Sequence, residues 1–129
     1  MSKFIIQVNS PAYGSSASYN AYRFALSALQ SGHVVDKVFF YQDGVLNTNH
    51  LNSPASDEFD LQQAWVSLSE TYNIALVNCV SAALRRGVLS QNDANENQLS
   101  HWNMEPPFTM GGLGELVTGI ETADRLVSF

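Results

Sequence analysis

The sequence predicts an α/β fold in which a largely parallel sheet carries helices on both faces. Short β-branched or aromatic runs alternate with segments of helical periodicity along the whole chain. The connections between them are short, and strands joined through helices pair in parallel by right-handed crossovers. The loops at the carboxyl ends of the strands then gather along one edge, which is where such sheets bind ligands.

The first two elements are a strand and a helix. Residues 4–8 (FIIQV) form a short apolar run of the kind found in strands buried on both faces. Residues 17–31 place apolar side chains at helical spacing, and Gly32 suits the end of that helix. The candidate caps of this helix are the serines at its start, Ser15, Ser16 and Ser18.

A second strand, a turn, a loop and a second helix follow. Residues 34–41 are apolar and β-branched or aromatic apart from two charged positions, and Asp43-Gly44 predicts a turn directly after them. The polar residues 47–56 predict an irregular loop. Ser56 is predicted to cap a helix that opens with acidic residues and ends near residue 73.

The third strand is the one that matters for chemistry. Residues 74–78 form it, and the only cysteine of the chain, Cys79, stands at its carboxyl end. The remaining predicted elements are a short helix (80–86), a turn of helix (91–98), a loop (101–109), a helix (111–123) and a final short strand (126–129).

Composition and charge limit the possible functions. The 129 residues fit one domain spanning positions 1–129, and no apolar run approaches the roughly eighteen residues that a membrane helix needs. A lone cysteine cannot form an internal disulfide, so a reducing cytoplasm is the expected compartment. A net charge of -6 disfavours electrostatic attraction to a phosphate backbone, so we expect no direct tRNA or DNA binding.

Several motifs are better explained by structure than by chemistry. The PAYGSS stretch (11–16) has one glycine and reads as an ordinary strand-to-helix turn rather than a phosphate loop. The three histidines show no ligand spacing and one thiolate cannot build a zinc site, so neither a metal nor a cofactor is expected. The acidic residues 57–60 suit a helix start. The apolar loop around Trp102 and Pro106-Pro107 could bind a partner or fold back onto its own sheet.

Cys79 is the strongest candidate for a functional residue. A single cysteine after an apolar run is more often an inert core residue. Here, however, it lies on the ligand edge, it opens a predicted helix whose amides favour a thiolate, and Arg85 and Arg86 follow as possible tuning groups.

Cys79 and Arg85 also spell C-x5-R after a strand, the spacing of Cys-dependent phosphatases. The five residues between them, VSAAL, argue against an oxyanion cradle because they favour helix over a loop whose amides converge. A Cys-dependent phosphatase is therefore only the alternative hypothesis for an enzymatic function.

Five stretches together closely resemble the DsrE family of sulfur-relay proteins, and the match runs from the first strand to the terminal LVSF. They are PAYG (11–14), VFFYQDGV (38–45), SPASDEFDLQQAW (53–65), CVSAALRRGV (79–88) and FTMGGLGEL (108–116). The resemblance implies a three-layer, flavodoxin-like fold with a mainly parallel five-stranded sheet. It also implies that Cys79 is the persulfide cysteine of a sulfurtransferase, the one site residue that carries over.

The resemblance implies partners as well. Such proteins assemble with TusB-like and TusC-like subunits into a heterohexamer, take sulfur from a TusA-like donor and pass it to a TusE-like acceptor. The sulfur ends as the 2-thio group of the wobble uridine of certain tRNAs. The polar segment 91–103 departs from the family pattern, which puts any partner contact there in doubt. Two alternatives remain, a DsrE-type subunit of dissimilatory sulfur oxidation and a binding subunit whose thiol is silent.

Overall fold

The computed structural model describes residues 1–129, the whole chain. Its elements, in chain order, are β1 (Lys3–Val8), α1 (Ala17–Gln30), β2 (Val34–Phe40), the 3-10 helix η1 (Gln42–Thr48), α2 (Leu61–Tyr72), β3 (Ala75–Cys79), α3 (Val80–Arg85), α4 (Gln91–Glu96), β4 (Phe108–Gly111), α5 (Leu113–Thr122) and β5 (Arg125–Ser128). None of these helices is long and apolar enough to cross a membrane.

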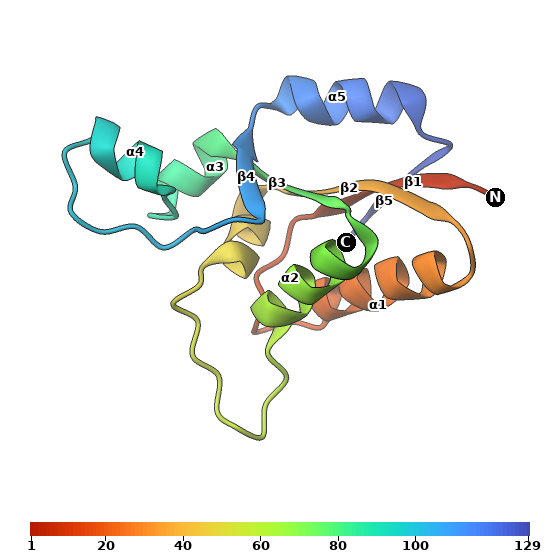
Figure 1. The fold of residues 1–129 in the computed structure, drawn as a ribbon, viewed down its shortest axis with the longest axis horizontal. Coiled ribbons are helices and arrows are strands. Elements are labelled where there is room, and N and C mark those ends of the chain that lie inside the picture. The colour runs from red at the N-terminus through yellow and green to blue at the C-terminus, as the bar shows by residue number, and fades with distance from the viewer.

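The five strands form one sheet in the order β4-β3-β2-β1-β5, and every neighbouring pair is parallel. The chain steps in one direction from β1 to β4 and then returns across the sheet to β5. Because crossovers are right-handed, the outward steps place their helices on one face and the return places its helix on the other. Accordingly, α1 and α2 cover one face and α5 covers the other (Figure 1). The predicted three-layer α/β class is confirmed.

The core is one continuous cluster of buried side chains. The indole of Trp65, on α2, is fully buried and meets the rings of Phe40 and Tyr22 edge to face, with centroids 5.4 and 5.6 Å away. On α1 the buried alanines Ala21 and Ala25 are one turn apart, so this helix packs closely against the sheet.

Two details of the local prediction are wrong, and a third is incomplete. The strand β4 was expected to be loop and helix start, and it lies at the edge of the sheet beside β3. The cap of α2 is Asp60, whose carboxylate accepts a hydrogen bond from Gln63 N, rather than Ser56. The predicted turn at Asp43-Gly44 exists, since Gly44 N donates to Tyr41 O, but it continues as η1 and includes the first residues of the expected loop.

A buried asparagine holds the loops at the carboxyl edge of the sheet in place. Asn47, at the end of η1, donates from Nδ2 to Ser10 O, Ser18 Oγ and Gly44 O, at 3.1, 3.1 and 2.9 Å. Its Oδ1 accepts a hydrogen bond from Trp65 Nε1 at 3.2 Å. Ser18, a predicted cap of α1, instead donates its hydroxyl to Ser10 O at 2.6 Å. These bonds tie the segments after β1 and β2 to both helices of that face.

Candidate functional site

Cys79 lies where the sequence predicts it, at the carboxyl end of β3. It is both the last residue of the strand and the N-cap position of α3, and its register partner on β4 is Gly111. The thiol is free, and the residue is only 3% exposed. The site is therefore a buried sulfur one strand in from the edge of the sheet.

The thiol belongs to the face of the sheet covered by α5. Register partners in a sheet direct their Cβ positions to the same face, so the thiol of Cys79 lies on the face to which a Cβ at Gly111 would point. Glu115, in the first turn of α5, packs on that side of Gly111: a methyl group added there would overlap its carboxylate and lie 2.8 Å from Val77 Cγ1. Gly111 therefore leaves the room in which the Glu115 carboxylate lies beside the end of β3.

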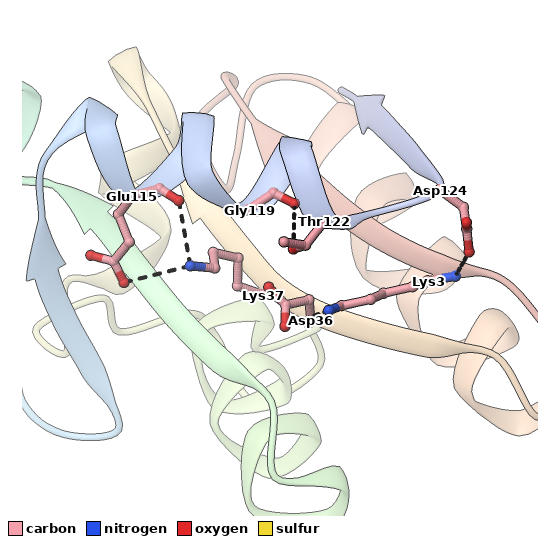
Figure 2. Close-up of polar contacts among 7 residues, drawn as sticks. All are labelled: Lys3, Asp36, Lys37, Glu115, Gly119, Thr122 and Asp124. Atoms are coloured by element: carbon pink, nitrogen blue, oxygen red, sulfur yellow. Dashed lines mark hydrogen bonds and ion pairs between the residues drawn. The ribbon is translucent and has the colours of Figure 1, made fainter.

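Glu115 is in turn held by a lysine from β2. Lys37 Nζ lies 3.7 Å from Glu115 Oε1 and 3.5 Å from the carbonyl oxygen of the same residue, as Figure 2 shows. The ammonium side chain is only 14% exposed, so this ion pair sits partly under α5. Sequence reasoning missed both residues, because only the register of β3 with β4 brings the first turn of α5 over this part of the sheet.

The two predicted tuning residues lie on α3 and away from direct contact with sulfur. Arg86 Nε bonds Asp43 Oδ1 at 2.8 Å, and its Nη1 donates to Ala82 O at 3.1 Å. Arg85 is exposed. Neither guanidinium donates a hydrogen bond to Cys79: that of Arg86 folds back only as far as Ala82. At a rise of about 1.5 Å per residue, the backbones of Arg85 and Arg86 lie roughly 9 and 10.5 Å from Cys79 along the helix axis.

The residues between Cys79 and Arg85 form helix rather than a loop. Val80–Arg85 is α3, as predicted, and its amides point along the helix axis instead of converging on an anion. The helix ends at Gly87, which has a φ of 72°, and Val88 N closes the turn on Ala83 O at 2.9 Å. The C-x5-R spacing therefore lacks the geometry of a phosphate cradle.

Asn78, the residue before Cys79, faces the opposite layer and is fully buried. Its Nδ2 donates to Thr48 Oγ1 at 2.7 Å and to Met104 Sδ at 3.2 Å, so it joins β3 to η1 and to the loop before β4. Its Oδ1 has no partner. The loop around Trp102 thus folds back onto its own sheet, the second of the two predicted alternatives: Met104 and Phe108 are 4% and 2% exposed.

The remaining polar candidates stay apart from the thiol. Asp60 caps α2, which explains one of the acidic residues at that helix start. His33 accepts a hydrogen bond from Ser2 N through Nδ1 at 3.0 Å. His50 and His101 line a surface cavity that does not include Cys79. No group of three or more His, Cys, Asp or Glu side chains could hold a metal ion.

Comparisons with known proteins agree on one family. The model of the DsrE/DsrF-like family matches residues 2–129. A protein of Klebsiella pneumoniae (strain 342) named "Sulfurtransferase TusD" is 48% identical over 127 residues, which are 98% of this chain and 99% of that protein. One of the same name from Pectobacterium carotovorum is 46% identical over 129 residues and covers both chains completely.

A solved structure shows the same fold at low sequence identity. The crystal structure of the ychN protein from E. coli superposes with a TM-score of 0.75 and covers 100% of both chains. The two sequences are 20% identical, so this likeness concerns the fold alone.

Proposed function

We propose that this chain, which belongs to the DsrE/DsrF-like family, carries sulfur as a persulfide on Cys79. Its function is sulfur transfer, the activity by which relatives at 46–48% identity over almost the whole chain are named. The observation that carries the assignment to Cys79 is its position: the only thiol of the chain ends an inner strand at the carboxyl edge of the sheet.

The chemistry needs only the thiol and a donor. The Cys79 thiolate attacks the outer sulfur of a donor persulfide, R–S–SH. The S–S bond of the donor breaks, R–S⁻ leaves with the electron pair, and a new S–S bond forms on Cys79. An acceptor thiolate then removes the outer sulfur from Cys79–S–SH in the same way, and the Cys79 thiolate leaves. Each step exchanges one S–S bond for another, so no oxidant or reductant is consumed.

Transfer also requires the sulfur to become accessible, because Cys79 is only 3% exposed. The element that follows it is well suited to opening. Helix α3 has six residues, fewer than a helix needs to be stable alone, and it buries only Ala82 and Ala83. Local opening of such a segment costs far less than unfolding the chain. We therefore propose that α3 moves when a partner approaches the thiol.

The partners and the end product follow as part of the same proposal. We propose that the chain works in a complex with TusB-like and TusC-like subunits, between a TusA-like donor and a TusE-like acceptor, in a reducing cytoplasm. The net charge of -6 suits a relay between proteins in which the tRNA is handled later. Dissimilatory sulfur oxidation would use the same cysteine, and the neighbouring genes distinguish the two pathways.

The direct test is the intact mass of the chain after incubation with a cysteine desulfurase, cysteine and a TusA-like donor, before and after mild reduction. We expect a reducible gain of one sulfur atom that Cys79→Ser abolishes. The burial of Cys79 favours one competing function, a binding subunit with a silent thiol. A thiol that gains no sulfur even with the partner subunits, and reacts with thiol reagents only in denaturant, would establish that alternative.

A further inference from the structure

A second feature of the carboxyl edge lies away from Cys79, between the segment after β1 and the loop before α2. It is a cavity of about 270 Å³ whose lining is apolar except for one carboxylate. The lining residues are Ala12, Tyr13, Tyr19, Glu58, Phe59 and Leu61. Two of the stretches that resemble the DsrE family, PAYG and SPASDEFDLQQAW, build most of this wall, although neither contains the cysteine.

Aromatic rings are fixed around this cavity by one another. Phe59 meets Tyr19 edge to face with centroids 5.1 Å apart and contacts Tyr22 at 5.7 Å. Tyr13 Oη donates to Phe59 O at 3.1 Å, which anchors the loop before α2 to the segment after β1. Yet Tyr13 and Phe59 remain 43% and 48% exposed. Two large rings are thus held in place while much of their surface faces solvent.

The charge beside these rings is negative and forms no ion pair within the chain. The three ion pairs of the molecule join Lys3 to Asp36, Lys37 to Glu115 and Arg86 to Asp43, so Glu58 pairs with no cation. Glu58 accepts one hydrogen bond, from Ala55 N at 3.0 Å.

The field of the acidic residues also reaches the rings. The pKa of Tyr13 is raised by partial burial and by the nearby carboxylates of Asp60 and Glu58. Aromatic faces beside an unpaired carboxylate attract a cation on an apolar stem.

One cation of the chain already contacts an aromatic ring of this lining. The guanidinium of Arg23 lies over the Tyr19 ring, 5.8 Å from its centroid, and donates to Tyr19 Oη at 3.2 Å. Arg23 is not among the residues that line the cavity. The contact shows that a guanidinium packs against one ring of the lining, that of Tyr19, while Glu58 and the exposed rings of Tyr13 and Phe59 have no such contact.

We propose that this cavity receives a lysine or arginine side chain of the protein that donates sulfur to Cys79. Its volume lies just below the range that encloses a drug-sized ligand, so a single side chain fits better than a larger molecule. The net charge of -6 steers basic partners towards the chain. The cavity and Cys79 both lie at the carboxyl edge of the sheet, so a protein docked here would lie along that edge. This proposal rests on the proposed function of sulfur transfer.

The first experiment tests the cavity without reference to sulfur. The ¹⁵N-labelled chain is titrated at low salt with Nα-acetylarginine amide and, as a neutral isostere, Nα-acetylcitrulline amide. We expect saturable amide shifts around residues 12–19 and 58–61 with the arginine probe only. Glu58→Gln should weaken the affinity for this probe at least threefold. Asp57→Asn is the matched control, because it removes the same charge one residue away from the lining and should change the affinity less than twofold. Equal shifts with both probes, or equal effects of both variants, would overturn the cation site.

The second experiment connects the cavity to transfer. Glu58→Gln should raise the concentration of a TusA-like persulfide donor needed for half-maximal transfer about fivefold, while the rate with glutathione persulfide stays unchanged. An unchanged donor requirement in Glu58→Gln would overturn the assignment to the donor even if arginine binds. Failure of Cys79 to accept sulfur from either reagent would overturn the proposed function together with this assignment, and the arginine titration would still decide the cation site separately.

Discussion

The close approach of η1 to the end of β1 should make Gly44→Ala strongly destabilising. A Cβ atom at Gly44 would overlap the carbonyl oxygen of Val8 and lie 2.6 Å from its carbonyl carbon and 3.3 Å from Asn9 N. Carbon atoms in contact normally lie about 3.5 to 4.0 Å apart. The atoms in the way are backbone, so no side-chain rotation relieves the overlap, and η1 must move by roughly 1 Å away from the sheet.

Two costs add up in this variant. Overpacking of a tight site costs about 1 to 3 kcal/mol. The carbonyl oxygen of Val8 also accepts a hydrogen bond from Tyr41 N at 2.9 Å, and losing that bond costs about 0.5 to 1.5 kcal/mol. The alanine offsets up to about 1 kcal/mol of this loss, because it lowers the conformational entropy of the unfolded chain. We therefore expect the free energy of unfolding to fall by about 1 to 4 kcal/mol, which for a chain of this size lowers Tm by roughly 4 to 15 °C.

Urea and thermal unfolding followed by circular dichroism measure this change, at one protein concentration for all variants. Gly114→Ala is the matched control: its Cβ would meet nothing within 4 Å and the residue lies inside α5, so stability should stay level or rise by up to about 1 kcal/mol. A loss below about 1 kcal/mol in Gly44→Ala would refute the reasoning that this contact fixes η1. The result bears on the site because η1 carries Asp43, the partner of Arg86 on α3.

Three further predictions concern the loops and the thiol. Asn47→Ala should lower the free energy of unfolding by about 3 to 5 kcal/mol in the same assay, because it leaves several buried polar groups without partners; a loss under about 1 kcal/mol would contradict this. Arg86→Ala removes an exposed ion pair and should cost at most about 1 kcal/mol. If its charge favours the Cys79 thiolate, alkylation near neutral pH should slow two- to threefold (~0.4 to 0.7 kcal/mol), and an unchanged rate would rule out this role. For Tyr13, the pKa is raised above 10.0, so the folded chain holds the phenol proton more tightly than the unfolded chain. Stability should therefore fall as pH rises above 10.0, and Tyr13→Phe, followed by unfolding at alkaline pH, should lessen that fall.

The sequence predicts the order of elements well because the apolar runs and the turn residues agree. It places Cys79 at the end of β3 because the run before it is continuous and a helix follows at once. It misses β4 because this strand has only four residues, directly follows Pro106-Pro107 and ends on a glycine, so the run is too short to predict a strand. That strand forms on backbone partners supplied by β3. The cap at Ser56 is wrong because Ser56 and Asp60 are both residue types that cap helices, and only the buried position of Leu61 decides between them.

What the sequence could not predict is the burial of the thiol, and burial is what makes a relay selective. An exposed persulfide would lose its outer sulfur to any thiolate that meets it. If α3 must open first, the rate of exchange with small thiols falls in proportion to the open fraction. An opening that costs about 2 to 3 kcal/mol lowers that rate roughly 30- to 150-fold. A protein partner that stabilises the open form recovers the loss, because binding that prefers one conformation shifts the population towards it. On the proposed function, the 3% exposure of Cys79 and the shortness of α3 would act together, so that a bound donor or acceptor determines when the sulfur can react.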